Sequence, residues 1–260
     1  MILDEIVEKR KINIAKQKQI KSLAMLKQEA EALPQNRDFP LEKALTKQDI
    51  NFICEVKKAS PSKGIIAQDF PYLTIAKEYE LAGASAISVL TEPDYFLGED
   101  KYLQEIAQNV SIPVLCKDFI IDEKQIIRAR NAGASVILLI VAALPEERLK
   151  ELYDYATELG LEVLVETHNR EELEIAHRIG ARIIGVNNRN LTTFEVDLQT
   201  SLDLAEYFQQ GPVYISESAI FSGQDAQAVA PHFQGILVGT ALMQAENVAE
   251  KIKELQIDKG

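Results

Sequence analysis

Short apolar runs alternate with helical patterns along most of this chain, and eight of the runs are predicted to be β-strands. From residue 51 onward, strands are expected near 51–57, 85–90, 112–117, 135–141, 161–166, 182–187, 212–216 and 235–239. Helical segments separate the runs, and a further one follows the last. Eight strand–helix units predict an α/β fold of the closed (β/α)8 TIM-barrel type, since open doubly wound sheets more often have about five or six strands.

The segment before the first strand is helical in pattern, from Leu3 through about Glu31. A helix rich in lysine can indicate a membrane surface or a targeting peptide, but interleaved acids argue against both uses. We therefore expect an extra helix packed against the barrel. No linker or low-complexity block interrupts the chain, so 1–260 is predicted to be a single domain, with a helical extension at 1–47 and the barrel at 48–260.

Composition narrows the range of functions. The 260 residues carry a net charge of −12, which disfavours nucleic-acid binding and docking on anionic membranes. It does not exclude an anionic small substrate, because a few lysines in a cleft can dominate the local field. No secretory signal and no apolar stretch of 18 residues is present, which predicts a cytoplasmic protein.

The two cysteines, Cys54 and Cys116, lie inside two of the apolar runs. If Glu55 and Lys117 point into the barrel, strand alternation turns both thiols outward, beneath the helices, where we expect them buried and reduced. No Cys-x-x-Cys or His-x-x-x-His spacing exists, so no metal site is predicted. The histidines at 168, 177 and 232 are scattered, and we interpret them as structural or exposed.

Several runs end in residues that can do chemistry. Glu55 and Lys57 share one face of the first strand, and in the barrel interior both charges would need partners. A pair on the outer surface is the alternative. The loop at 58–64, which includes Ser60, is rich in hydroxyl groups and amines and suits an anionic ligand.

Lys117 and Glu166 end two other apolar runs. Burial lowers the pKa of a lysine and raises that of a glutamate, so Lys117 is a candidate general acid or Schiff-base amine and Glu166 a candidate general base. Alternatively, Lys117 extends to solvent without a function.

The last three strands end in polar residues too. Asn187 can orient a substrate hydroxyl and Arg189 can hold an anionic oxygen, although Asn-Arg-Asn is equally compatible with a turn. In barrels of this type the loops after strands seven and eight commonly bind phosphate through backbone N–H groups. No Walker loop is present, which argues against nucleoside triphosphates. The candidates in these two loops are Glu217, Ser218, Gly239 and Thr240.

These residues stand in stretches that closely resemble the indole-3-glycerol-phosphate synthase family, the ring-closing enzymes of tryptophan biosynthesis. The resemblance spans nearly the whole chain, and its most specific blocks contain Glu55 and Lys117. The matching stretches are 2–7, 55–64, 88–92, 113–122, 164–166, 185–191 and 216–218, with Phe96 and Gly98.

The resemblance implies a carboxy-lyase that acts on 1-(2-carboxyphenylamino)-1-deoxyribulose 5-phosphate without metal or organic cofactor. The ring carbon that bears the carboxylate attacks the ribulose carbonyl, and the adduct loses carbon dioxide and water. The resemblance gives Lys117 the role of general acid, Glu166 that of general base, and Lys57 a contact with the carboxylate. A monomer, or weak association with other enzymes of the tryptophan pathway, is compatible with it.

The remaining roles follow the same resemblance. Glu55 is expected to orient the lysines. Asn187, Arg189 and Glu217 are expected to position the anilino-ribulose portion, and the phosphate cradle would consist of Ser60, Ser218, Gly239 and Thr240.

Two positions depart from the family pattern. Ala219 stands where the family usually has glycine, and Thr240 where it often has Ser or Glu. A positive φ at Ala219 would cost about 1 kcal/mol or more.

Two other classes of function remain open at this point. One is another phosphosugar barrel, such as phosphoribosylanthranilate isomerase or a Schiff-base aldolase. The other is a barrel that binds a phosphosugar without catalysis, which would need only the phosphate loops.

Overall fold

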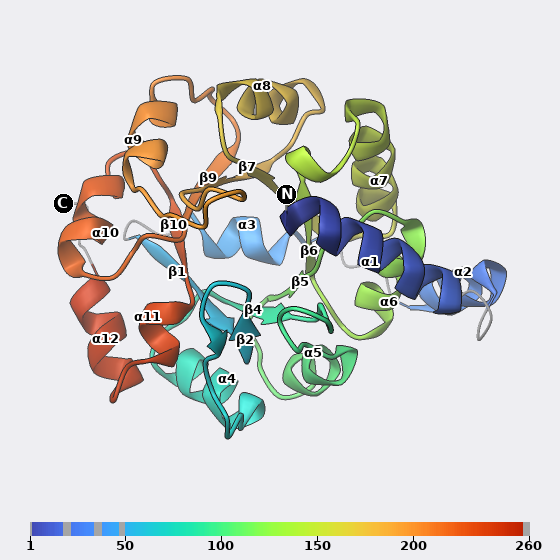
Figure 1. Cartoon of the computed structure of the whole chain (residues 1–260), viewed down its shortest axis with the longest axis horizontal. Coiled ribbons are helices and arrows are strands. Elements are labelled where there is room, and N and C mark those ends of the chain that lie inside the picture. The colour runs from blue at the N-terminus through green and yellow to red at the C-terminus, as the bar shows by residue number, and fades with distance from the viewer. Residues whose placement is uncertain (1, 18–21, 34–37, 47–49, 257–260) are drawn as a thin grey trace.

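Eight parallel strands close into a barrel at the centre of the protein (Figure 1). The computed structural model describes residues 2–17, 22–33, 38–46 and 50–256. Each strand pairs with its neighbours in the chain, and the last strand pairs with the first, as the (β/α)8 prediction requires. The strands are β1 (Asn51–Val56), β4 (Ala86–Leu90), β5 (Val114–Lys117), β6 (Val136–Ile140), β7 (Glu162–Thr167), β8 (Ile183–Asn187), β9 (Val213–Glu217) and β10 (Gly235–Val238).

Helices surround the barrel, at least one after each strand (Figure 1). They are α4 (Tyr72–Leu81), α5 (Asp100–Ala107), α6 (Glu123–Asn131), α7 (Glu146–Glu158), α8 (Arg170–Arg178), α9 (Gln199–Ala205), α10 (Gly223–Val229), α11 (Thr240–Met243) and α12 (Val248–Leu255), with a 3-10 turn at Val141–Ala143 before α7. The predicted capping box of Asp122 and Gln125 starts α6. Within the described part of the chain, no helix is both long and apolar enough to cross a membrane.

Strand alternation divides the buried apolar residues into two layers. Inward-facing residues such as Ile53 and Leu115 fill the barrel, whereas their neighbours face the helices. Cys54 and Cys116 belong to the outer layer, and both are buried free thiols, as predicted. Burial raises the pKa of both thiols, so neither resembles a reactive cysteine.

The prediction of one helix from Leu3 to Glu31 is wrong. The structure has α1 (Ile2–Gln17) and α2 (Leu23–Ala32), while residues 18–21 lie outside the described part. Ser22 is extended, and its side chain accepts a hydrogen bond from the Met25 N–H, so α2 starts with its own cap. The periodic apolar pattern hides such a break, because both helices keep an apolar face.

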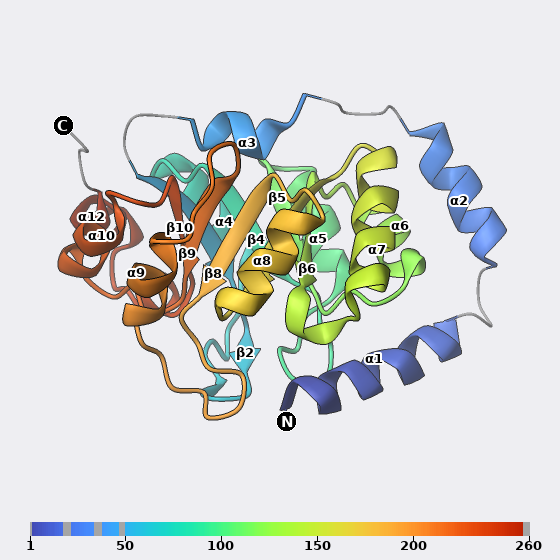
Figure 2. The ribbon, with the colours of Figure 1, turned by 90° about the horizontal axis from the view of Figure 1, so that it is seen from above.

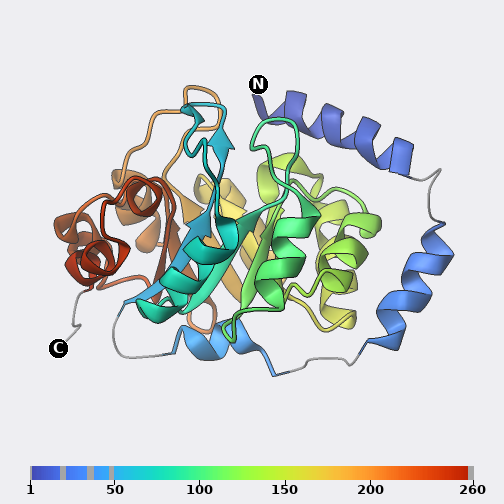
Figure 3. The same ribbon diagram turned by 90° about the horizontal axis from the view of Figure 1, so that it is seen from below.

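The two ends of the barrel are covered differently (Figures 2 and 3). Helix α3 (Pro40–Ala44) closes the amino end, where Leu41 and Leu45 join the inner layer. The Glu162 carboxylate accepts the backbone N–H groups of Leu41 and Glu42 at 2.7 and 2.8 Å. At the carboxyl end lie α1 and a short hairpin of β2 (Ala59–Ser60) and β3 (Gly64–Ile65), which the sequence predicted only as a loop.

Helix α1 is held to the barrel by a buried ion pair. The Arg10 guanidinium contacts the Asp118 carboxylate, and both side chains are almost fully buried. Farther along the helix, Asn13 donates a hydrogen bond of 2.8 Å to Asp94. Because Asp118 directly follows Lys117, this pair links the N-terminal helix to the end of β5.

Arg10→Met is expected to lower the free energy of unfolding by about 3–5 kcal/mol, because Asp118 then remains buried without its counter-charge. The double variant Arg10→Met/Asp118→Asn is expected to recover most of this loss. The control is Lys9→Met, since Lys9 is exposed and lies 3.8 Å from Asp94; its effect should stay below about 1 kcal/mol. Urea denaturation measures all three, and equal losses for Arg10→Met and Lys9→Met would contradict the account.

Candidate active site

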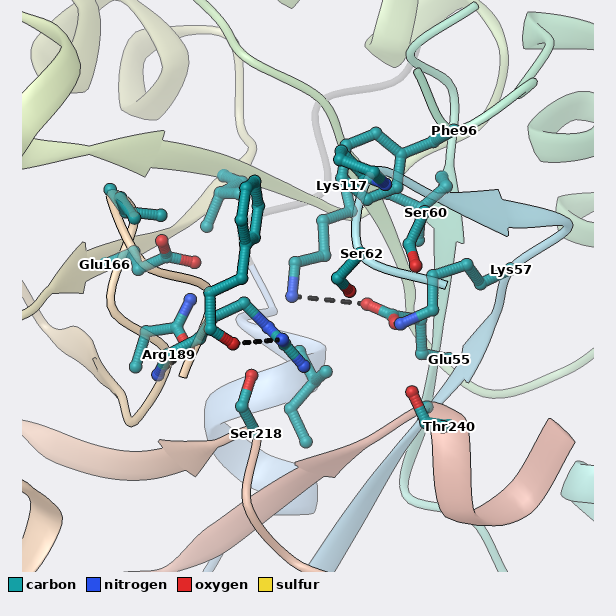
Figure 4. A pocket seen from close by; sticks show the side chains of 18 of the residues that line it. Glu55, Lys57, Ser60, Ser62, Phe96, Lys117, Glu166, Arg189, Ser218 and Thr240 are labelled. Carbon is teal, nitrogen blue, oxygen red and sulfur yellow. Dashed lines mark hydrogen bonds and ion pairs between the residues drawn. The ribbon is translucent and has the colours of Figure 1, made fainter. Parts of the chain in front are cut away.

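The carboxyl ends of the strands surround one pocket (Figure 4). Of the predicted site residues, all but Glu217 line it: Glu55, Lys57, Ser60, Lys117, Glu166, Asn187, Arg189, Ser218, Gly239 and Thr240. Glu217 is fully buried immediately beneath it, in contact with Lys117. The topology therefore brings together side chains from most of the barrel strands and from the loops that follow them.

Glu55, Lys57, Lys117 and Glu217 form a connected group of charges. Lys57 Nζ lies 2.5 Å from Glu55 Oε1, and Lys117 Nζ lies 3.2 Å from Glu55 Oε2. Lys117 Nζ also lies 3.0 Å from Glu217 Oε2. Glu55 thus holds two lysines, and Lys117 holds two carboxylates. The alternatives of a surface Glu55–Lys57 pair and of a Lys117 that reaches solvent are wrong.

The predicted lowering of the Lys117 pKa is also wrong. Burial does lower it, but the carboxylates of Glu217, Glu55 and Glu166 outweigh burial and raise the pKa above its ordinary value. Lys117 is therefore an ammonium group at neutral pH, which is the form that a proton donor needs. It is not the neutral amine that attack on a carbonyl carbon requires.

The carboxylates that contact Lys117 differ in their proton affinity. Burial would raise the pKa of Glu55, but Lys57 and Lys117 lower it to about 2. Burial raises the pKa of Glu217 to about 7; the Lys117 charge opposes this rise, and the nearby Glu166 and Glu55 add to it. Glu55 is consequently a permanent anion, whereas Glu217 titrates close to neutral pH.

Glu166 lies across the pocket from Glu55, with Lys117 between them (Figure 4). The prediction of a raised pKa is wrong here too, because burial is outweighed by His168, Lys117 and Asn187, which together lower the pKa of Glu166. His168 Nε2 lies 3.1 Å from Glu166 Oε1. Sequence reasoning missed His168, although the spacing Glu-x-His at the end of a strand was a signal that the two side chains share a side.

Two glycines make room for the buried carboxylates. A Cβ at Gly239 would lie 2.3 Å from Glu55 Oε1, and a Cβ at Gly185 would lie 2.1 Å from Glu217 Oε1. Gly239 thus has a steric role beside the predicted phosphate contact. Gly185 was not predicted as a site residue, although a glycine in a strand interior often marks a close approach of another group.

Gly185→Ala is expected to lower the free energy of unfolding by about 1–3 kcal/mol, because the new methyl group overlaps the Glu217 carboxylate. In a Glu217→Ala background the same change should cost less than about 1 kcal/mol, since the overlapping atoms are absent. Urea denaturation of the four proteins gives the coupling between the two sites. Additive effects would show that Gly185 is needed for another reason.

The loop after β9 has an unusual backbone. Ser218 and Ala219 have φ values of 63° and 60°, in the left-handed region that favours glycine. Buried Asn188 supports this loop: its Nδ2 atom donates to the Ser216 hydroxyl and to the Glu217 backbone carbonyl, both at 3.0 Å, and lies 3.3 Å from the Ser218 carbonyl. The departure at Ala219 therefore carries the strain that the sequence analysis considered.

Ala219→Gly is expected to raise the free energy of unfolding by about 0.5–1 kcal/mol. Relief of the left-handed strain exceeds the extra entropy that glycine gives the unfolded chain. The control is Ala228→Gly in the exposed face of α10, where the same substitution should lower stability by about 1 kcal/mol. Thermal and urea denaturation measure both, and a loss of stability in Ala219→Gly would contradict the interpretation.

Arg189 belongs to the loop after β8. Its backbone N–H donates to Asn187 Oδ1 and its guanidinium to the Phe194 carbonyl, both at 3.0 Å. Arg189 also pairs with Val196 across an isolated β-bridge, so the loop folds back on itself beside the pocket. These contacts keep the guanidinium in the pocket wall, where it can meet an anionic oxygen.

The opposite wall is apolar. Phe96 and Phe119, whose ring centroids lie 6.0 Å apart, line the pocket with Leu138 and Ile140. The buried Glu92 carboxylate accepts the backbone N–H groups of residues 94 to 96, which fixes the loop that carries Phe96. An apolar wall beside a charged floor suits a ligand that has both a ring and anionic groups.

The chemistry available in the pocket is acid–base chemistry. A protonated lysine and an ionised glutamate stand on different strands, and short loops with hydroxyl groups and backbone N–H groups surround them. Across the residues that the structure describes, no group of three or more His, Cys, Asp or Glu side chains is arranged to hold a metal ion.

Comparisons with known proteins give consistent matches along most of this chain. The family model of indole-3-glycerol phosphate synthase matches residues 3–255. The indole-3-glycerol phosphate synthase of Streptococcus pneumoniae strain Taiwan19F-14 is 65% identical over 251 residues, which cover 96% of this chain and 94% of that protein. The protein of the same name from strain CGSP14 is 74% identical over 211 residues, or 81% of this chain and 83% of the relative.

A solved structure is similar in fold alone. Thiamine phosphate pyrophosphorylase from Pyrococcus furiosus aligns with a TM-score of 0.58 at 19% sequence identity, covering 79% of this chain and 93% of that chain.

Proposed function

This chain belongs to the indole-3-glycerol phosphate synthase family, and we propose that it converts 1-(2-carboxyphenylamino)-1-deoxyribulose 5-phosphate to indole-3-glycerol phosphate. The enzymes of this family are carboxy-lyases of tryptophan biosynthesis. The observation that carries the proposal is the placement of Lys117 between Glu55 and Glu166 at the pocket floor. It supplies a proton donor and a proton acceptor on separate strands within one pocket.

The shape of the pocket supports this substrate. The apolar wall of Phe96 and Phe119 suits the anilino ring, and Lys57, which also lines the pocket, suits the ring carboxylate. The loops after β9 and β10, with Ser218, Gly239 and Thr240, together with Ser60, suit the phosphate. Ser218 and Thr240 lie along the same edge of the pocket (Figure 4). Asn187 and Arg189 then face the chain that joins the two ends, while Glu217 lies beneath the pocket and acts through its contact with Lys117.

In the proposed reaction Lys117 protonates the ribulose carbonyl oxygen while the ring carbon that bears the carboxylate attacks the carbonyl carbon. The C–C bond to the carboxylate then breaks, and carbon dioxide leaves. Lys57 then protonates the new hydroxyl group, whose C–O bond breaks so that it leaves as water. Glu166 accepts the proton that the five-membered ring loses in the same step, which completes the indole ring. Glu55 fixes the direction of Lys57 and Lys117, because it contacts both, and it helps to keep Lys117 protonated.

Lys117→Met and Glu166→Gln are each expected to lower kcat by about 10²- to 10⁴-fold, because each removes one proton-transfer group. Indole fluorescence after addition of the substrate, without added metal, measures the product. The control is Lys101→Met, which changes a lysine on the outer helix α5 and should leave kcat unaffected.

Other outcomes would identify other functions. If wild type binds the substrate without forming indole, the protein is a binding barrel rather than a synthase. If borohydride traps substrate on Lys117, the protein uses Schiff-base chemistry, and the acid role is wrong.

A further inference from the structure

His168 lies between two carboxylates, one of which, that of Glu166, lines the pocket. It occupies the turn between β7 and α8, two residues after Glu166. Its Nε2 atom is 3.1 Å from Glu166 Oε1, and its Nδ1 atom is 3.0 Å from Glu172 Oε2. The side chains of His168, Glu166 and Glu172 are 12%, 3% and 15% exposed, so solvent screens these charges little.

The far side of the imidazole is fixed by the start of α8. Glu172 accepts the backbone N–H of His168 at 2.9 Å and the side-chain amide of Asn169 at 2.8 Å. Asn169 in turn accepts the backbone N–H of Glu172 at 2.9 Å and caps the helix. In an ordinary capping box Glu172 would reach back to the N–H of the cap residue, Asn169. Here it holds His168 instead.

Charge balance in the pocket leaves Glu166 dependent on His168. The carboxylates of Glu55 and Glu217 share Lys117, and Glu55 also has Lys57. The groups that act on the Glu166 carboxylate are His168 from the β7–α8 turn, Lys117 from β5, Asn187 from β8 and Glu217 from β9. Two of these groups are cations. Lys117 already contacts two other carboxylates, those of Glu55 and Glu217, whereas His168 contacts one other, that of Glu172.

We propose that His168 is a positioning residue that keeps Glu166 ionised and fixes the direction of its carboxylate toward the pocket. This inference rests on the proposed function, because it assigns His168 to the general base of that reaction. The Glu172–His168–Glu166 chain resembles other carboxylate–histidine arrangements in which an anchored carboxylate sets the orientation of the ring. Here the group that the imidazole ring orients is itself a carboxylate, that of Glu166.

The electrostatics agree with the geometry. Burial would lower the pKa of His168, but Glu166 and Glu172 raise it to about 10, so the imidazole is cationic at neutral pH. The same contact lowers the pKa of Glu166. The Nε2 contact is an ion pair without a well-aligned hydrogen bond in this structure. The positive charge of the imidazole and the reach of its Nε2 atom toward Glu166 can therefore be tested by separate substitutions.

Two substitutions separate these effects. His168→Gln keeps an N–H group near the position of Nε2 and removes the positive charge. His168→Asn keeps one near Nδ1 and loses contact with Glu166. Glu172→Gln is a milder variant that retains an acceptor for the His168 backbone N–H. The control is His177→Gln, because His177 lies on α8, the helix that follows His168, and its Nε2 atom is 3.0 Å from the Tyr214 hydroxyl.

The first readout is the pH profile of kcat/KM, whose acid limb reports ionisation of the free enzyme. His168→Asn is expected to move the acid limb upward by about 1–3 pH units, since a cation in contact with Glu166 is lost. Its kcat on the plateau should fall about 10- to 100-fold through misdirection of the carboxylate. His168→Gln should show the pH shift with a smaller loss of kcat, and His177→Gln should match wild type.

The second readout is the pKa of the Glu166 carboxyl, measured by ¹³C NMR with labelled glutamate and assigned with Glu166→Gln. It is expected to rise in both His168 variants, because the cation beside Glu166 is lost, and not to rise in Glu172→Gln, which keeps that cation and removes a nearby negative charge. An unchanged carboxyl pKa and an unchanged acid limb in folded His168→Asn would overturn the proposal and leave His168 as part of a helix cap.

The two proposals fail in different ways. If wild type forms no product at any pH, the proposed function is wrong, but the carboxyl pKa still tests the coupling of His168 to Glu166. If wild type forms product and the His168 variants keep its pH profile, the positioning role alone is wrong. Circular dichroism establishes folding, and His168→Gln carries the test if His168→Asn does not fold.

Discussion

Compensation of buried charge governs the arrangement of the barrel mouth. An isolated ion at the position of Lys117 or Glu217 would cost several kcal/mol. Lys117 compensates two carboxylates at once, at 3.2 Å from Glu55 and 3.0 Å from Glu217, and Glu55 in turn compensates Lys57. An anionic ligand that enters the pocket has to compete with these carboxylates for the lysines. The site is therefore preorganised for negative charge while its own charges remain paired.

The same compensation constrains the backbone. The carboxylates of Glu55 and Glu217 occupy the space that a side chain at Gly239 or Gly185 would need. Gly185 lies on β8 and Gly239 immediately after β10, whereas Glu55 lies on β1 and Glu217 on β9. The constraint therefore extends to strands that carry neither carboxylate. The loop after β9 is likewise strained at Ala219, and it persists because its surroundings hold it in place.

Much of the fold was predictable from the sequence because barrel strands are short, apolar and evenly separated. The eight strands lie within two residues of the predicted bounds, and outward-facing Cys54 and Cys116 follow from alternation alone. The candidate residues converge because all parallel strands point their carboxyl ends to one side. The break before α2 was not predictable from periodicity, since a capped start at Ser22 preserves the apolar face. The β2–β3 hairpin is too short to give an alternating pattern.

The electrostatic state of the site was the part that sequence reasoning predicted wrongly. Burial of Lys117 and Glu166 was correctly expected, and burial alone would lower the pKa of the one and raise that of the other. Both shifts have the opposite sign, because residues distant in the chain, such as Glu217 for Lys117, lie within contact distance, and because His168 folds back onto Glu166. Burial of a single residue indicates the size of the desolvation penalty. Only the assembled set of partners determines whether the charged form of the residue is favoured.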